Sequence, residues 1–341
     1  MKIAIHHRAG SFSDRWIAYC EQQNIPFKIV NAFDSNIIEQ VKNCDVFMWH
    51  HNHIQYEDVL TAKRILFALE HAGIKVFPDF KTGWHFDDKV AQKYLLEAID
   101  APLVPSYVFY DKQEALSWAE STDYPKVFKL KGGSGSSNVR LVKNFHESKR
   151  LIKKAFGKGF PQTDRFYSFK EHIRRVKEGK SGLIGVLKAI GRLFILPAFA
   201  KQQSHERGYV YFQDFIENDG FDIRTTVMNN RAIAFKRLTR RNDFRASGSG
   251  DVIFEYENLD KEYISLAFSI AKKLNSQSVA MDFVKSKTGE IKLIEISYGF
   301  TADGYEEAFA GYWDSKINWH EEQFNPQEWM LEVLIKPHAI R

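Results

Sequence analysis

Short apolar runs alternate with helix-like stretches over the first eighty residues, and this alternation restricts the fold more than any other feature. Expected strands cover residues 2–6, 26–30, 45–49 and 74–77, and expected helices cover 14–22, 36–42 and 56–71. Strands that alternate with helices form a parallel sheet with helices on its faces. We therefore predict an α/β, Rossmann-like N-terminal domain, although no GxGxxG follows its first strand. Its ligand would bind at the carboxyl ends of the strands, near residues 6–8 and 50–53.

Composition narrows the class of protein. A chain of 341 residues exceeds the usual size of one core, so two or three lobes are expected. The 44% of hydrophobic residues exclude a disordered chain. The two cysteines, Cys20 and Cys44, lack the spacing of a metal site, which is typical of a reducing compartment. Neither a secretory signal nor an apolar run of about 20 residues is present, so we expect a cytoplasmic protein.

Positive charge is concentrated in one segment. Residues 151–205 contain twelve Lys or Arg and three acids, a net charge of +9, whereas the whole chain carries +5. Within it, residues 181–201 have apolar side chains at helical spacing, with Lys188 and Arg192 on one polar face. Such a helix either packs on the rest of the protein or makes peripheral contact with an anionic membrane, here the inner membrane face. A third interpretation is that it steers a polyanionic substrate such as an acidic glycan. No aromatic–basic interleaving indicates nucleic acid binding.

A glycine- and serine-rich loop follows Lys129 and separates two expected strands, residues 124–131 and 138–142. Glycine lets backbone N–H groups approach oxyanions without interference from a Cβ atom. The pattern indicates a flap over phosphates, and the alternative is a tight hairpin with solvated lysines. The loop residues concerned are Gly133, Ser134, Gly135 and Ser136.

Two further patterns carry charge. An expected hairpin of residues 279–285 and 290–297 puts Asp282 roughly opposite Glu295, with Ser297 on the same face as Glu295. Paired carboxylates repel unless a cation lies between them, and oxygen ligands suit Mg²⁺; the alternative is a pair of surface acids. Residues 237–248 form an arginine-bearing strand end and loop, which suits a phosphoryl group or is simply solvated. His50, His51 and His53 have no nearby residues that complete a zinc site, so they are better candidates for lining a cleft.

The order of these patterns is similar to that of a known family. Its parts are Asp88-Lys89, Lys129 with its loop, Gln213–Ile216 followed by Gly220–Arg224, Asp243–Arg245, and Asp282 with Glu295-Ile296-Ser297. From about residue 84 to 335 the chain resembles the ATP-grasp superfamily, and its second half resembles the ribosomal-protein glutamate ligase-like carboxylate–amine ligases. The resemblance implies a pre-ATP-grasp domain (1–83), a flap lobe (84–205) with the basic insert 151–205, and a catalytic lobe (206–341).

The resemblance also implies roles for individual residues. Lys89, Lys129 and the loop would hold the phosphates of ATP, and Asp222 the ribose. Arg237 and Arg245 would stabilise charge on the transferred phosphoryl group. Asp282, Glu295 and Ser297 would bind Mg²⁺, with Mn²⁺ as the alternative ion; the family usually has Asn where this chain has Ser297. The adenine hinge would comprise Gln213, Asp214, Phe215 and Ile216.

The activity implied is that of an ADP-forming ligase, which joins a carboxylate to an amine through an acyl phosphate. The basic insert favours amidation of a uronic acid in a surface glycan or its precursor, that is, a part in polysaccharide biosynthesis. The alternatives are an ATP-grasp kinase, a peptide-tailing ligase, and a nucleotide-binding, membrane-associated module that has lost catalysis at Ser297. The sequence does not indicate an oligomeric state.

Overall fold

The computed structural model divides into two compact units. It describes residues 1–132, 138–161, 173, 176, 205–240, 243–246, 251–254, 256, 259–300 and 310–335. Unit 1 comprises Met1–Phe86, Tyr94–Leu103 and Asn218–Arg341, and unit 2 comprises Asp87–Lys93 and Val104–Glu217. The predicted domain boundaries at 83/84 and 205/206 stay a prediction.

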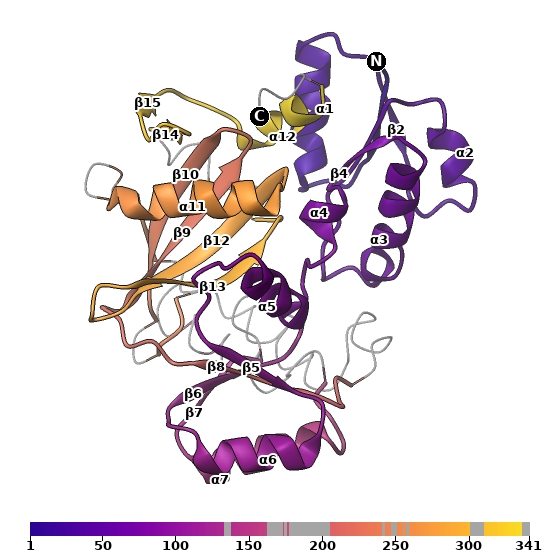
Figure 1. Ribbon diagram of the computed structural model, residues 1–341. Helices are drawn as coiled ribbons and strands as arrows, with labels where there is room; N and C mark the ends of the chain where they lie inside the picture. The colour runs from indigo at the N-terminus through magenta and orange to yellow at the C-terminus, as the bar shows by residue number, and fades with distance from the viewer. Residues whose placement is uncertain are drawn as a thin grey trace. The chain divides into compact units, whose positions relative to one another are not determined.

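The N-terminal part of unit 1 is a four-stranded parallel sheet in the order β2-β1-β3-β4, as the alternating pattern predicts (Figure 1). The two central strands are buried along their whole length because helices cover both faces of the sheet. The strands are β1 (Ile3–His6), β2 (Phe27–Val30), β3 (Val46–Trp49) and β4 (Lys75–Phe77). The helices are α1 (Phe12–Gln22), α2 (Ile37–Val41), α3 (Tyr56–His71) and α4 (Phe80–Gly83).

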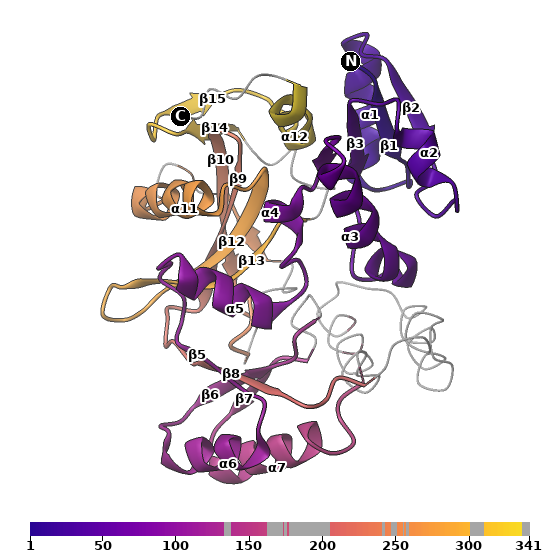
Figure 2. The same cartoon turned by 45° about the vertical axis from the view of Figure 1, so that its right-hand side comes forward.

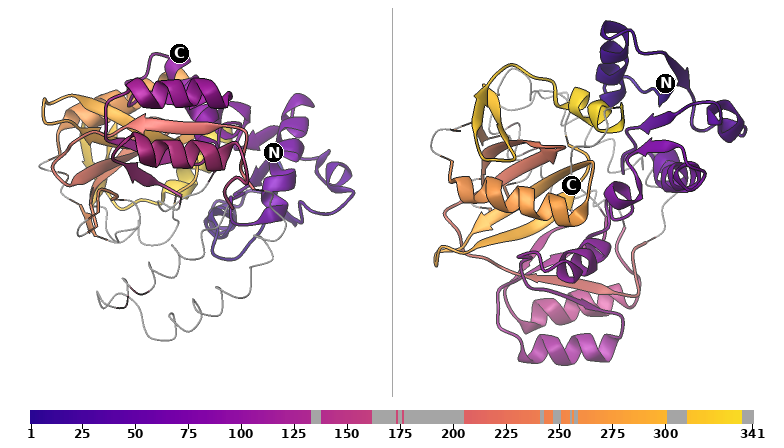
Figure 3. Two further views of the ribbon diagram at one scale, coloured as in Figure 1. Left: turned by 90° about the horizontal axis from the view of Figure 1, so that it is seen from below. Right: turned by 45° about the horizontal axis from the view of Figure 1, so that its top comes forward.

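The C-terminal part of unit 1 is an antiparallel sheet in the order β13-β12-β9-β10-β14-β15, with β11 paired to β10. Helix α11 (Lys261–Leu274) lies across one face of this sheet (Figures 1 and 3). Alternation along the strands separates the apolar face packed on α11 from an opposite face, which is polar around Asp222 and Asp282 and apolar around Met228 and Phe235. The strands are β9 (Phe221–Met228), β10 (Arg231–Leu238), β11 (Val252–Ile253), β12 (Ser278–Lys285), β13 (Ile291–Ser297), β14 (Gly311–Asp314) and β15 (Trp319–Glu321).

Local sequence fixes both ends of α11. The Asp260 side chain caps its start by accepting a hydrogen bond from the Glu262 backbone N–H, and Asn275 ends it in the left-handed conformation (φ 50°). The residues of α11 that face the sheet are apolar and recur at helical spacing: Ile264, Ala267, Ile270, Ala271 and Leu274. Burial of each large aliphatic side chain stabilises the fold by about 1.5–3 kcal/mol.

The two parts of unit 1 share a hydrophobic core, which explains why they form one unit. Helix α12 (Pro326–Ile335) packs against α1 and β4. Phe12 and Trp329 belong to the same buried cluster as Met228 and Tyr298. The Gln277 side chain adds a polar tie, since its amide donates to the Val76 carbonyl.

Unit 2 is built on an antiparallel sheet in the order β5-β8-β6-β7, with α6 and α7 packed together against it (Figures 2 and 3). Its core contains small residues of the helices and aromatic residues of the sheet, among them Ala119, Ala155, Phe128 and Phe212. The strands are β5 (Ser106–Phe109), β6 (Lys126–Lys129), β7 (Arg140–Val142) and β8 (Val210–Asp214). The helices are α6 (Lys112–Ser121) and α7 (Phe145–Ala155). Helix α5 (Lys89–Ala98) begins in unit 2 and ends in unit 1.

No helix among the described residues is both long and apolar enough to cross a bilayer. The basic segment 181–201, for which the sequence left packing and membrane contact open, lies outside the described residues.

Candidate active site

The late hairpin has the predicted register. Asp282 of β12 pairs directly with Glu295 of β13, and Ala280 pairs with Ser297. A register shift after Asp282 gives β13 one extra residue, so the hairpin has a bulge next to the acidic pair. The chain therefore brings two carboxylates side by side at one end of the hairpin.

Two arginines lie beside these carboxylates on the polar face of the sheet. Arg224 of β9 pairs in register with Asp282, and its Nε and Nη2 atoms donate to the two carboxylate oxygens at 2.7 and 2.9 Å. Arg237 of β10 pairs with Asp222 in the same bidentate way, at 2.7 Å for both bonds. The Nη2 atom of Arg237 also lies 2.8 Å from Oδ2 of Asp282. Asp222, Arg224, Arg237 and Asp282 thus form a continuous ion-pair network, called the charge network below.

Burial makes the charge network strongly interdependent. Asp222, Arg237 and Asp282 are all buried, and removal of one partner would leave an uncompensated charge. Burial alone would raise the pKa of Asp282, but Arg224 and Arg237 hold it well below its usual range. Burial raises the pKa of Asp222, even though Arg237 opposes that shift. The same two carboxylates raise the pKa of Arg237 against the effect of its burial. Asp282 consequently stays ionised, as a metal ligand must.

The predicted metal ligands fit a divalent cation by their chemistry. Asp282 and Glu295 supply carboxylate oxygens, and Ser297 supplies a hydroxyl that now donates to the Gly299 carbonyl at 2.8 Å. Mg²⁺ commonly takes one or two carboxylates and completes its shell with phosphate and water oxygens. In the described part of the chain, no three His, Cys, Asp or Glu residues gather as a metal site, and this includes His50, His51 and His53. A cation here would therefore need additional oxygens from a ligand.

The predicted nucleotide residues of unit 2 converge on β6 and β8. The Lys129 ammonium donates to Oε1 of Gln213 at 2.7 Å, and Gln213 in turn donates to Oγ of Ser106. Lys129 and Gln213 are both buried. Lys89 is buried as well, and its backbone N–H donates to the Lys131 carbonyl next to the flap. These contacts join Lys129 to Gln213 and tie the start of α5 to the strand end next to the flap.

Lys126, which the sequence analysis did not single out, lies on the opposite face of β6 from Lys129, the face covered by α6. Its ammonium forms an ion pair with Asp214 at 2.6 Å and lies over the rings of Tyr107 and Trp118. Lys126 lies opposite Asp214 in the register of β6 and β8. This pair of residues could be recognised only once the two strands were known to be neighbours. Phe215 and Ile216 follow directly after β8.

The flap begins between two paired strands, β6 and β7, as expected for a strand–loop–strand element. Gly133, Ser134, Gly135 and Ser136 lie outside the described residues. At the start of the loop, the backbone N–H groups of Lys131 and Gly132 point at the carboxylate of Glu206, at 3.2 and 3.4 Å. The Tyr209 hydroxyl also donates to Glu206 and accepts from the Lys131 N–H. Glu206, which the sequence reading also missed, therefore anchors the first residues of the flap.

Arg245 forms an ion pair with Asp243, two residues earlier in the chain. Its guanidinium binds the Asp243 carboxylate, and the Arg245 carbonyl accepts from the Arg240 backbone N–H. Asp222, Arg237, Arg245, Asp282, Glu295 and Ser297 belong to unit 1, whereas Lys89, Lys129, Gln213, Asp214, Phe215 and Ile216 belong to unit 2.

Comparison with known proteins agrees with this arrangement of strands. Residues 199–309, which include β8 to β13, match the family model of the RimK-like ATP-grasp domain. This third of the chain is similar to an ATP-grasp domain. The resemblance inferred from the motifs is thereby confirmed for this part of the chain.

Solved structures extend the likeness to the whole chain as a fold. One is the biotin carboxylase domain of 2-oxoglutarate carboxylase from Hydrogenobacter thermophilus, crystallised with MgADP (TM-score 0.60, 16% identity, 100% of this chain and 70% of that one). Another is N5-carboxyaminoimidazole synthetase from Staphylococcus aureus (TM-score 0.56, 12% identity, 98% of this chain and 76% of that one). A third is a RimK domain ATP-grasp protein from Sphaerobacter thermophilus (TM-score 0.51, 14% identity, 87% of this chain and 90% of that one). No curated protein sequence matches this chain. These identities support the fold, and the predicted α/β architecture is confirmed.

Proposed function

We propose that this ATP-grasp chain is a Mg-ATP-dependent, ADP-forming ligase that joins a carboxylate to an amine. The observation that carries the proposal is the register of Asp282 and Glu295 beside Arg224 and Arg237, on a domain of RimK-like type. Acids that bind a divalent cation and arginines that bind oxyanions are the two kinds of group that phosphoryl transfer requires. The MgADP in one structural relative supports ATP and Mg²⁺ as the ligands, with Mn²⁺ as the alternative ion.

The proposed reaction has two steps. A carboxylate oxygen attacks the γ-phosphorus of ATP, so an O–P bond forms, the bond to the β-phosphate oxygen breaks, and ADP leaves. The amine then attacks the acyl carbon, a C–N bond forms, and phosphate leaves with the acyl oxygen while the amine proton passes to phosphate or solvent. The first step is needed because a free carboxylate is a poor electrophile. Mg²⁺ supplies charge neutralisation for the phosphates when it is bound.

The side chains contribute binding, orientation and fixed positive charge. Arg224 and Arg237 stay protonated beside the carboxylates, so they can stabilise negative charge when the cation shares or takes over Asp282. Asp282 and Glu295 would hold the cation, with Ser297 as a hydroxyl ligand or as the anchor of a bound water. The buried Lys129 would contact a phosphate, and the segment from Gln213 to Ile216 the adenine. Asp222 would hold the ribose only if it exchanged Arg237 for the sugar hydroxyls, since its two oxygens are bound to that arginine.

The finer proposal is that the carboxylate is a uronic acid of a surface glycan or its precursor. Its support is the positive charge of residues 151–205. Peripheral contact with an anionic membrane through residues 181–201 is the accompanying proposal, at the inner membrane face. Flotation with anionic liposomes tests that contact, and binding that persists in a Lys188→Glu/Arg192→Glu variant contradicts it.

The reaction class is tested by ADP release from the purified chain with uronic acids and amino acids as candidate carboxylates, each with and without an amine. A ligase needs both substrates for turnover and forms an amide visible by mass spectrometry. ADP release with a carboxylate alone, accompanied by a stable phosphorylated product, would instead identify a kinase. The absence of any effect of Mg-ATP on the melting temperature would contradict every nucleotide-dependent function, including that of a non-catalytic nucleotide-binding module.

A further inference from the structure

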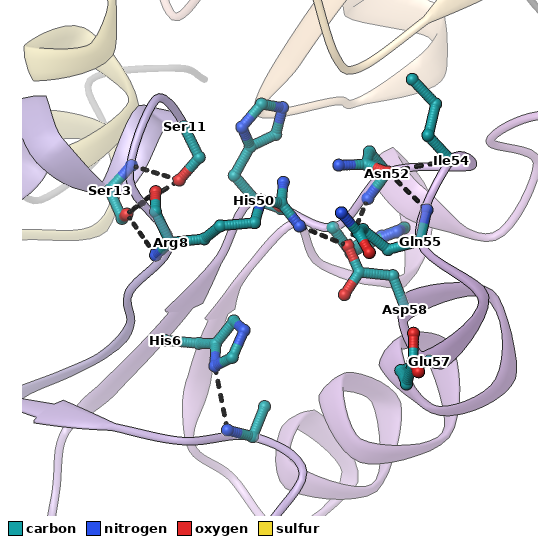
Figure 4. Close-up of polar contacts among 12 residues, drawn as sticks. His6, Arg8, Ser11, Ser13, His50, Asn52, Ile54, Gln55, Glu57 and Asp58 are labelled. Carbon is teal, nitrogen blue, oxygen red and sulfur yellow. Dashed lines mark hydrogen bonds and ion pairs between the residues drawn. The ribbon is translucent and has the colours of Figure 1, made fainter. Parts of the chain in front are cut away.

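The carboxyl ends of β1 and β3 lie next to each other, because the two strands are parallel neighbours. Arg8 follows β1 by two residues and His50 follows β3 directly. Figure 4 shows their side chains together beyond the strand ends, and the Nη2 atom of Arg8 donates to the His50 carbonyl at 2.9 Å. Ligands of parallel α/β sheets bind at this edge.

The hydrogen bonding of His50 fixes its tautomer. The backbone N–H of Phe12, the first residue of α1, donates to Nδ1 of His50 at 3.1 Å. A backbone N–H is only a donor, so Nδ1 must carry a lone pair, and the proton of the neutral ring is on Nε2. Burial, aided by the charge of Arg8, lowers the pKa of His50 to about 3. The ring is thus a neutral Nε2–H donor across the physiological range.

The Nε2 atom of His50 lies beside the end of the late hairpin. A Cβ atom placed on Gly299 would lie 3.8 Å from it, and the Gly299 carbonyl accepts the hydroxyl of Ser297. The ring is held there by stacking on Phe12, with centroids 3.6 Å apart and planes at 4°. The hydroxyl of Tyr298, the residue after β13, donates to the carbonyl of His51. The end of the strand that carries Glu295 is therefore tied to the end of β3 within one compact unit.

Arg8 supplies a positioned positive charge at the same place. Its Nη1 atom binds Oδ2 of Asp58 at 2.8 Å, and that fully buried carboxylate also accepts from the Asn52 backbone N–H. The Arg8 side chain is 27% exposed. Among the described contacts, Arg8 uses two of its five N–H donors and His50 uses only Nδ1 and its carbonyl. The remaining donors of both side chains are available to a ligand or to water.

We infer that Nε2–H of His50 and the guanidinium of Arg8 form the subsite that binds the carboxyl group of the substrate, next to the metal ligands of β13. The inference rests on the proposed ligase function and names the residues that would hold the acceptor oxygen. Two N–H donors and one fixed cation match a carboxylate and not an ammonium group, which needs acceptors. A neutral imidazole also avoids repelling a protonated amine substrate.

Formate, the smallest carboxylate, is the probe, because a site built for a carboxyl group binds it without any knowledge of the rest of the substrate. The measurement is the long-range ¹H–¹⁵N spectrum of the histidine rings in the full-length chain, with sodium chloride at equal ionic strength as the reference. We expect His50 as the neutral Nε2–H tautomer, with a saturable shift of Nε2 on addition of formate. In Arg8→Lys the formate-dependent shift of Nε2 of His50 should be several-fold smaller. The exposed ring of His71 should show no formate-dependent shift.

Each result either supports or contradicts the carboxylate subsite. An Nδ1–H tautomer, or no formate-dependent shift at His50, overturns the subsite. If formate binds but Mg-ATP does not raise the melting temperature, the subsite stands and the ligase function fails. If the chain releases ADP with a carboxylate and an amine, His50→Gln must raise the KM for the carboxylate several-fold and leave the KM for ATP unchanged. A His71→Gln variant, matched in chemistry but remote from the strand ends, should change neither KM.

Discussion

Arg224 binds both carboxylate oxygens of Asp282 across two neighbouring strands, at 2.7 and 2.9 Å. A cation that uses Asp282 as a ligand must therefore share or displace this arginine. The released guanidinium would lie where a phosphate bound to the same cation needs positive charge. The ion pair thus couples cation binding to the availability of Arg224.

Replacement of Arg224 should destabilise the chain and strengthen its response to Mg²⁺. In Arg224→Gln, buried Asp282 retains only Arg237, and we expect a loss of about 2 kcal/mol in the free energy of unfolding. Added MgCl₂ should recover more stability in the variant than in the wild type, because it replaces the missing charge. Urea unfolding with and without MgCl₂ measures both effects, and equal recovery in the two proteins would contradict the competition.

Asp282→Asn should abolish turnover. An amide is a weak metal ligand, and we expect ADP release to fall by roughly 10²-fold or more. The gain in melting temperature from Mg-ATP should shrink as well. Asp314→Asn is the control, since Asp314 pairs with His320 in β14 and β15, remote in sequence from the hairpin. Similar losses in both variants would show that the effect comes from folding.

Lys129→Met should weaken nucleotide binding more than cation binding. The substitution keeps the length of the buried side chain but removes the ammonium that would meet a phosphate. We expect the Kd for Mg-ATP to rise by roughly 10-fold, measured by calorimetry. Lys149→Met on α7, whose ammonium lies over the ring of Phe145, is the matched control. An unchanged Kd in Lys129→Met would remove this lysine from the nucleotide site.

Ser297→Asn tests whether the hydroxyl limits the metal site. The amide oxygen reaches further than the hydroxyl, which now donates to the Gly299 carbonyl. We expect a several-fold lower Mg²⁺ concentration at half-maximal ADP release. A higher requirement would indicate that the Ser297–Gly299 contact shapes the site and that Ser297 does not act as a substitute ligand.

Buried neutral histidines should make stability fall at mildly acidic pH. Burial, with the charge of Lys63, lowers the pKa of His85 to about 4. The unfolded chain takes up the proton near pH 6.5 and the folded chain does not, so stability is lost as the pH falls from 6.5 towards 4. At pH 5 the loss from His85 is about 2 kcal/mol. His85→Gln should show a smaller difference in urea midpoint between pH 7 and 5 than wild type, whereas His71→Gln should not.

The sequence predicted much of the fold because short-range patterns specify it. Alternation of apolar runs indicated the parallel sheet, and the helix predicted at Tyr56–His71 is found with the same bounds. The hairpin pattern predicted that Asp282 lies roughly opposite Glu295, and a bulge after Asp282 completes this pairing in the structure. The aromatic-rich C-terminal segment was less informative: Trp313 and Trp319 lie on strands β14 and β15 ahead of α12, and the sequence analysis predicted neither strand. Strand pairs this short draw their stability from distant packing, which the local pattern does not contain.

The sequence by itself determined which residues carry charge, glycine or a carboxylate, and where along each strand they lie. Only the tertiary structure decided their partners: Arg224 with Asp282, Arg237 with Asp222, and Glu206 with the root of the flap. It also decided that His50 meets the end of the late hairpin, some 250 residues further along the chain. The spacing of residues along a strand determines the face of the sheet on which each side chain lies, because successive side chains alternate between the two faces. Partners depend on which strands become neighbours, and that follows from the burial of the whole core.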